Sequence, residues 1–221
     1  MLPVAVGRGD PEAGASTIEL NIYYIPADLA ETGRDVEERY LEVVRAVKAA
    51  VSIPVAVKLG PCFSAIGQMA REIVLAGADG LVLFNRFYQP DFDIDKIGIT
   101  RTLDLSVPAE IRPGLLWLAV LYGRVGASLA ATTGVETYRE VVKYLMAGAD
   151  VVMTTSSLLR HGPEHLERLL EGLTDWLLEH DYSSLDDLRG CMGLNRVPDA
   201  TAYERANYIR ILEEFEAPEF A

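Results

Sequence analysis

Cysteine, histidine and tryptophan are scarce in this chain, with 2, 3 and 2 copies among 221 residues. Cys62 and Cys191 lie in opposite halves of the sequence, and no second cysteine or histidine stands near either one at a metal-ligand spacing. This shortage excludes a disulfide scaffold and a structural zinc site. We therefore expect no metal and two reduced thiols.

Positive charge is also in short supply. Lysine and arginine total 20 against 33 for aspartate and glutamate, which gives a formal net charge of −13. Such a field repels phosphate backbones and anionic lipid headgroups, so we expect neither nucleic acid nor a membrane as a partner. A small anionic substrate is still compatible with this charge, because its site needs only a few amides and cations inside a cleft.

Long apolar runs are missing too. No stretch approaches the roughly 18 apolar residues that span a bilayer, and residues 1–8 lack the basic and apolar regions of a secretory signal. Half of the residues are apolar and 24% are charged, which is typical of a globular protein. We expect a cytoplasmic protein with one large domain or two small ones.

A turn built from glycine and small residues recurs before apolar runs, at 13–16, 76–79, 125–128 and 147–150. Each turn indicates a helix that ends on glycine and leads into a strand. The predicted strands are 17–24, 53–59, 80–86, 128–133 and 151–156, and the predicted helices between them are 35–51, 64–76, 109–125 and 136–147. The strands are mostly continuously apolar, as in parallel sheets covered on both faces.

These βα units repeat about every 30 residues, which predicts an α/β fold with a parallel sheet of the (β/α)8 TIM-barrel type. A barrel closes with eight strands, whereas five are predicted here. We therefore expect three βα units, roughly 90 residues, to be missing from the front. Residues 1–221 are then a single partial-barrel domain, with strands four to eight in 14–162 and a helical extension in 163–221.

The ends of the last two predicted strands carry small and hydroxylated residues. Gly134 follows one strand, and Thr155 and Ser156 end the next. In a barrel these positions are strands seven and eight, where loops commonly hold a phosphate. Glycine permits a close approach of the backbone, and hydroxyls donate hydrogen bonds without adding charge. The pattern favours a phosphate site over hydroxyls that only cap the next helix.

Three polar side chains interrupt other apolar runs. Lys58 ends a strand, so its ammonium would emerge at the barrel mouth, where it could stabilise negative charge or form a Schiff base with a carbonyl substrate. The alternative is a lysine that extends to solvent. Asn21 and Asn85 either satisfy neighbouring backbone groups or present a donor and an acceptor to a ligand.

Five segments stand in order at predicted strand ends: 20–24, 57–59, 84–86, 131–135 and 154–158, the last followed by 161–163. From about residue 14 onward they resemble the FMN-binding barrel of the dihydroorotate dehydrogenases. The resemblance implies an FMN-dependent oxidoreductase that acts on a CH–CH bond of a small carboxylate-bearing substrate in pyrimidine biosynthesis. It implies FMN contacts from Asn21, Lys58, Asn85, Thr133, Gly134, Thr155 and Ser156, and substrate contacts from Asn21, Asn85 and Arg86.

The chain departs from the family pattern at the position of the catalytic base. Tyr24 stands where the family has a cysteine or serine base, and Pro26 replaces a substrate-contacting asparagine. A phenol, with a pKa near about 10, is a poor base unless a cation lowers that pKa. Tyr24 is therefore the weaker of two catalytic candidates, after Lys58.

Two further departures concern the ligand contacts. Thr133 replaces a glycine of the family, and Arg86 replaces a small hydroxylated residue. The planar guanidinium of Arg86 suits a substrate carboxylate, but an ion pair with a nearby acid is an equal alternative. The nearby acids are Asp91, Asp93 and Asp95.

Three functional hypotheses remain open. The first is the FMN-dependent oxidoreductase, and the second is a barrel lyase that uses Lys58 as a Schiff base. The third is a truncated, non-catalytic fragment. Because an incomplete barrel leaves the strand 17–24 at an unpaired edge, we also expect a homo-oligomer, or a partner that supplies the missing strands.

Overall fold

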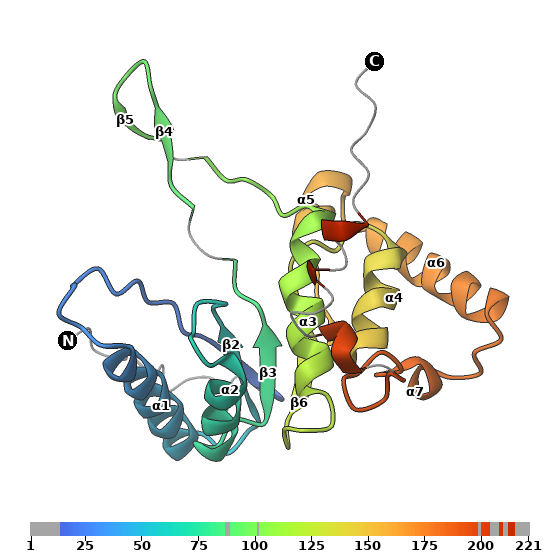
Figure 1. Ribbon diagram of the computed structural model, residues 1–221, viewed down its shortest axis with the longest axis horizontal. Helices are drawn as coiled ribbons and strands as arrows, with labels where there is room; N and C mark the ends of the chain where they lie inside the picture. The colour runs from blue at the N-terminus through green and yellow to red at the C-terminus, as the bar shows by residue number, and fades with distance from the viewer. Residues whose placement is uncertain are drawn as a thin grey trace.

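The computed structural model describes residues 14–86, 89–100, 102–198, 200–203, 208–209 and 212–214. Its main sheet has five parallel strands in the order β1-β2-β3-β6-β7 (Figure 1). The strands are β1 (Ile18–Asn21), β2 (Val55–Leu59), β3 (Gly80–Leu83), β6 (Ser128–Ala131) and β7 (Val151–Val152). The predicted α/β fold with a parallel sheet is confirmed. Within the described residues this sheet is open and does not close into a barrel.

Helices follow the strands, as predicted. They are α1 (Gly33–Ala50), α2 (Ile66–Leu75), α3 (Ile111–Leu121), α4 (Tyr138–Ala147), α5 (Ser156–His161), α6 (His165–Glu179) and α7 (Leu185–Leu188). Successive helices α1, α2, α3, α4 and α6 contact one another in that order. The short 3-10 helices η1 (Pro108–Glu110) and η2 (Ala200–Tyr203) complete the described elements.

The residues of strand β2 alternate between the hydrophobic core and the opposite face of the sheet. Val55, Val57 and Leu59 alternate along the strand and are fully buried in the hydrophobic core, with residues of the helices. Successive side chains of a strand point to opposite faces, so Lys58 lies on the other face. Asn21 of β1 is its register partner. The polar candidates therefore face away from the helix layer, near the carboxyl ends of the strands.

The recurring glycine turn also ties neighbouring strands together. Gly77 has φ 113°, a left-handed conformation that favours glycine. Two residues later, Asp79 Oδ2 accepts a hydrogen bond from the Val55 N–H of the neighbouring strand at 2.8 Å. The turn before β7 repeats this arrangement, because Asp150 Oδ2 accepts from the Leu129 N–H of β6 at 2.8 Å. In both turns, the aspartate side chain thus accepts a hydrogen bond from a backbone N–H near the start of the neighbouring strand.

Several predicted boundaries are wrong. The helix predicted at 109–125 ends at Leu121, and Gly123, with φ 68°, follows it. The strand predicted at 151–156 ends at Val152, and α5 begins at Ser156. The sequence pattern also missed the antiparallel hairpin β4 (Asp91–Asp93) and β5 (Gly98–Thr100), which projects from the rest of the molecule in Figure 1. The predicted turn at 13–16 and the predicted helical extension in 163–221 lie partly outside the described residues.

The Asp79 tie predicts a pH-dependent stability. The hydrogen bond from Lys48, followed by that from the Val55 N–H, holds the pKa of Asp79 below its usual 3.8. A carboxyl whose pKa is lowered by folding stabilises the fold above pH 3.8, and this stabilisation is lost as the pH falls through the folded pKa. We expect Asp79→Asn to lower the free energy of unfolding by about 1 kcal/mol at pH 7.

Thermal denaturation followed by circular dichroism at several pH values checks this expectation. The difference between Asp79→Asn and the unsubstituted chain should shrink as the pH falls below 3.8. Replacement of the exposed Asp175 on α6 by asparagine is the matched control and should change little at any pH. A deficit in Asp79→Asn that is equally large at low pH would refute the role of the carboxylate charge.

Candidate functional site

A cavity of about 150 Å³ lies at the carboxyl ends of β2, β3, β6 and β7. Seven residues singled out from the sequence line it: Lys58, Asn85, Arg86, Thr133, Gly134, Thr155 and Ser156. A neighbouring cavity of about 210 Å³ shares Asn85, Arg86 and Thr133 with it and extends toward α3 and α4. Residues from four separate strand ends therefore meet at one place.

Lys58 provides a half-buried cation in the wall of the smaller cavity. Its side chain is 20% exposed, and its Nζ lies 3.3 Å from Glu19 Oε1 on the adjacent strand. An ion pair of this kind fixes the direction of the long side chain, so the ammonium has a defined place beside the cavity.

The two asparagines form a direct pair. Asn85 Nδ2 donates to Asn21 Oδ1 at 2.6 Å, across the 64 positions that separate them in sequence. Asn85 lines both cavities, whereas Asn21 is an exposed neighbour that contacts Asn85. The structure therefore brings Asn21 beside the cavity wall through its partner.

Arg86 is anchored by an acid that the sequence analysis did not name. Its Nε donates to Glu110 Oε1 at 3.0 Å, while Glu110 Oε2 accepts from the Val107 N–H at 2.7 Å. Arg86 therefore does form an ion pair, but its partner is Glu110 and not the suggested Asp91, Asp93 or Asp95. Glu110 fixes the guanidinium at the junction of the two cavities.

Thr133 and Gly134 have unusual backbone conformations, with φ 80° and 72°. The Thr133 Oγ1 donates to the Phe84 carbonyl at 3.2 Å, and the buried Tyr144 hydroxyl donates to the carbonyls of Thr132 and Thr133 at 3.1 and 2.9 Å. Burial raises the pKa of Tyr144, so its hydroxyl remains a donor. These bonds hold the loop after β6 in a conformation that is costly for a β-branched residue.

The left-handed φ of Thr133 gives a stability prediction. Thr133→Ala removes the hydroxyl but keeps a Cβ, whereas Thr133→Gly also removes the steric cost of a positive φ. We expect the glycine variant to be more stable than the alanine variant by about 1 kcal/mol, in urea denaturation. At a normal helical or extended position the order would be reversed, so an alanine variant that is equally or more stable would contradict the strain.

The residue that sequence reasoning missed is Ser106. It is 7% exposed and lines the cavity. Its Oγ accepts from the Gly134 N–H at 3.1 Å and donates to Ser156 Oγ at 2.9 Å, and its own N–H donates to Ser156 Oγ at 3.1 Å. Arg160 Nη2 donates to the Ser106 carbonyl at 2.7 Å, while Arg160 Nη1 contacts Glu136 Oε2 at 2.5 Å. Ser106 lies between Leu105 and Val107, and no motif in the sequence marks it as a site residue.

Tyr24 is the candidate that the structure does not bring to the site. It is absent from the linings of both cavities. Its hydroxyl donates to Glu31 Oε2 at 2.5 Å, and Arg39 lies 4.0 Å above its ring while pairing with Glu31 at 2.7 Å. Arg39 is a cation that the sequence did not predict beside Tyr24, but the phenol proton is already engaged by the Glu31 carboxylate. This geometry does not support Tyr24 as the base.

The donors and the size of the cavity suit a phosphate group better than a whole nucleotide. Lys58, Thr155 and Ser156 line a space of about 150 Å³, whereas sites for complete drug-sized ligands measure roughly 300–1,000 Å³. The set therefore fits the phosphate of FMN, and Asn85 and Arg86 continue into the second cavity.

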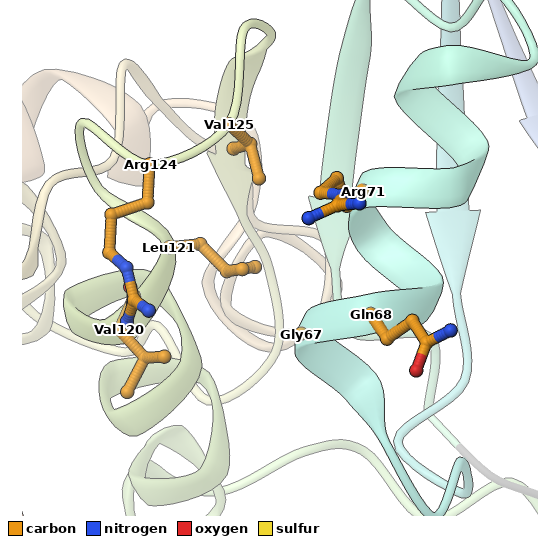
Figure 2. A pocket seen from close by; sticks show the side chains of 7 residues that line it. All are labelled: Gly67, Gln68, Arg71, Val120, Leu121, Arg124 and Val125. Carbon is orange, nitrogen blue, oxygen red and sulfur yellow. The ribbon is translucent and has the colours of Figure 1, made fainter.

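A further cavity, of about 610 Å³, lies between α2 and α3 (Figure 2). Its lining consists of Gly67, Gln68, Arg71, Val120, Leu121, Arg124 and Val125. It shares no residue with the cavity at the strand ends. Among the residues that the structure describes, no three His, Cys, Asp or Glu side chains gather as a metal site, and no helix is long and apolar enough to cross a membrane.

The comparison with protein families gives one match. The family described as dihydroorotate dehydrogenase matches residues 14–177. This range contains every residue that lines the cavity at the strand ends.

Individual relatives point the same way. The chain is 29% identical over 187 residues to the catalytic subunit of dihydroorotate dehydrogenase B (NAD(+)) of Methanothermobacter thermautotrophicus, covering 81% of this chain and 61% of that protein. A putative dihydroorotate dehydrogenase A (fumarate) of Aeropyrum pernix is 29% identical over 189 residues, covering 81% and 60%. The corresponding B-type subunit of Petrotoga mobilis is 33% identical over 153 residues, covering 67% and 50%.

The chain thus spans between half and about three fifths of the length of these curated relatives. The family match nevertheless extends over most of the 221 residues and contains all five strands of the main sheet. This chain belongs to the dihydroorotate dehydrogenase family.

Proposed function

We propose that this chain forms the FMN-phosphate side of an FMN-dependent oxidoreductase that acts on a CH–CH bond of a small, carboxylate-bearing substrate. The observation that carries the proposal is the single cavity lined by seven residues that the sequence had singled out independently. The chain covers 61% or less of the relatives described above. We therefore propose this activity for a complete enzyme that contains this fold.

Each group has a separate role in this proposal. The Thr155 and Ser156 hydroxyls donate to the phosphate, and Lys58 places a positive charge where the reduced flavin carries negative charge. Arg86, fixed by Glu110, receives a substrate carboxylate. FMN, when bound, supplies the hydride acceptor, and the chain supplies position and electrostatics.

Titration of the chain with FMN and with riboflavin, followed by flavin fluorescence, tests the proposal. Riboflavin lacks the phosphate, so a site built around phosphate donors should bind FMN at least about tenfold more tightly, which corresponds to about 1.4 kcal/mol. We expect the affinity for FMN to be micromolar or weaker, since the described sheet is open and encloses only part of a flavin. Equal affinities for the two flavins would refute the phosphate site. Nanomolar binding of FMN would refute the expectation that this chain supplies only part of the flavin contacts.

The lyase alternative has less support. Schiff-base formation requires a nitrogen that is free to attack a carbonyl, whereas Lys58 Nζ is held 3.3 Å from the Glu19 carboxylate. Treatment with small aldehydes and ketones followed by borohydride should therefore leave the mass of the chain unchanged at Lys58. A trapped adduct at that residue would restore the lyase hypothesis.

The open sheet supports the proposal that the chain associates. β1 pairs only with β2 among the described strands. Along this edge strand Glu19 and Asn21 are exposed, whereas their neighbours Ile18, Leu20 and Ile22 are half-buried against the core. An unpaired edge still invites a further strand. We expect a dimer or larger species in sedimentation velocity, and a monodisperse monomer would contradict this.

A further inference from the structure

The Ser106 hydroxyl contacts two of the residues that the sequence assigned to a phosphate, Gly134 and Ser156. The Gly134 N–H donates to Ser106 Oγ at 3.1 Å, and Ser156 Oγ is 2.9 Å from the same atom. In the wall of the cavity, the Gly134 N–H is thus already engaged by a side chain of the protein itself.

We propose that Ser106 competes with the ligand phosphate for the Gly134 N–H, and thereby sets the affinity and anion selectivity of this subsite. The inference rests on the proposed function, because it concerns the same cavity. It makes Ser106 a specificity-determining residue of a phosphate site, with a role separate from that of the donors themselves.

The physical basis is the limited number of hydrogen bonds that each group can make. The Gly134 amide has one proton, so it cannot serve Ser106 and a phosphate oxygen with full strength at once. A buried N–H is rarely left unpaired, so one acceptor must replace the other. A phosphate oxygen is the stronger acceptor because its hydrogen bond is charge-assisted. An uncharged ligand group has no such advantage over the serine hydroxyl.

Displacement of Ser106 also has a cost outside the cavity. Its carbonyl accepts from Arg160 Nη2 at 2.7 Å, and the same guanidinium is held by Glu136. The next residue, Val107, donates its N–H to Glu110, the acid that anchors Arg86. Both contacts hold the peptide group between Ser106 and Val107. These tethers oppose the departure of Ser106 and lower the apparent affinity for phosphate.

Titration with inorganic phosphate, followed by isothermal calorimetry, compares the chain with Ser106→Ala. Without the competing hydroxyl, phosphate should bind about tenfold more tightly, and Ser106→Thr, which keeps a hydroxyl, should return toward the original affinity. Ser183→Ala is the control and should leave the affinity unchanged. Ser183 is an exposed serine that donates to Asp187 and does not line the cavity. Unchanged or weaker binding by Ser106→Ala, with phosphate binding intact in the original chain, would overturn the inference, because Ser106 would then be a neutral neighbour or a ligand donor.

Hydrogen exchange at the Gly134 amide gives a readout that does not depend on flavin. We expect the amide to be protected in the original chain, to exchange faster in Ser106→Ala, and to regain protection in that variant when phosphate is added. If Gly134 loses protection but neither chain binds phosphate or FMN, both the proposed function and the competition fail. If both chains bind FMN but Ser106→Ala binds phosphate no more tightly, the competition alone fails.

Discussion

Lys58→Ala should weaken FMN binding by the chain about tenfold, whereas Tyr24→Phe should leave it unchanged. Lys58 lines the same cavity as the strand-end hydroxyls of Thr155 and Ser156. Tyr24 contacts Glu31 and Arg39 outside both cavities. In a complete enzyme containing this fold, Lys58→Ala should also lower the flavin reduction potential and slow reduction by about a hundredfold.

The matched measurements are fluorescence titration for binding and stopped-flow reduction for the complete enzyme. Lys58→Arg retains the charge and should recover part of the binding. The ranking of the two residues fails if Tyr24→Phe abolishes flavin reduction while Lys58→Ala leaves it intact. That outcome would make Tyr24 the base, and the loop that carries it would have to move toward the cavity.

Gly134→Ala should destabilise the fold by about 3 kcal/mol and abolish phosphate binding. Gly134 has φ 72°, and a Cβ there would lie 2.7 Å from Ile111 Cγ2 and 2.8 Å from the Val107 carbonyl oxygen. Both distances are far below ordinary van der Waals contact, and the carbonyl belongs to the backbone that anchors Ser106. The loop after β6 and the start of α3 must therefore separate.

Urea denaturation measures this loss, and Gly33→Ala at the start of α1 is its control. A Cβ at Gly33 meets no atom within 4 Å, so its replacement should cost less than about 0.5 kcal/mol. A Gly134→Ala chain that is as stable as Gly33→Ala would show that the loop can relax, and that close packing does not fix the position of Gly134.

The strands and the site loops could be predicted because their signals are local. The valine-rich run before Lys58 and the glycine–alanine–aspartate turns before β3 and β7 each define a strand and its start. Parallel strands bring their carboxyl ends together, so ordered segments at those ends converge on one cavity. Lys58, Gly134 and Ser156 were therefore identified without any knowledge of their contacts.

The missed features depend on contacts that are remote in sequence. Ser106 and Ser156 are 50 positions apart, and Arg86 and Glu110 are 24 apart. No periodicity or turn motif links such pairs, because the fold alone brings them together. Tyr24 differs, because its partner Glu31 is only 7 positions away, but both lie in an irregular loop whose path no periodicity or turn motif predicts.

We propose that the cavity at the carboxyl ends of β2, β3, β6 and β7 holds the phosphate of FMN. A titration of the isotopically labelled chain with FMN, followed by amide chemical shifts in ¹H–¹⁵N NMR spectra, tests this directly. We expect the largest shifts at Ser106, Gly134, Thr155 and Ser156, and we expect inorganic phosphate to move the same amides. Shifts confined to the cavity between α2 and α3, at Gly67, Arg71 and Arg124, with the strand-end amides unmoved, would contradict it.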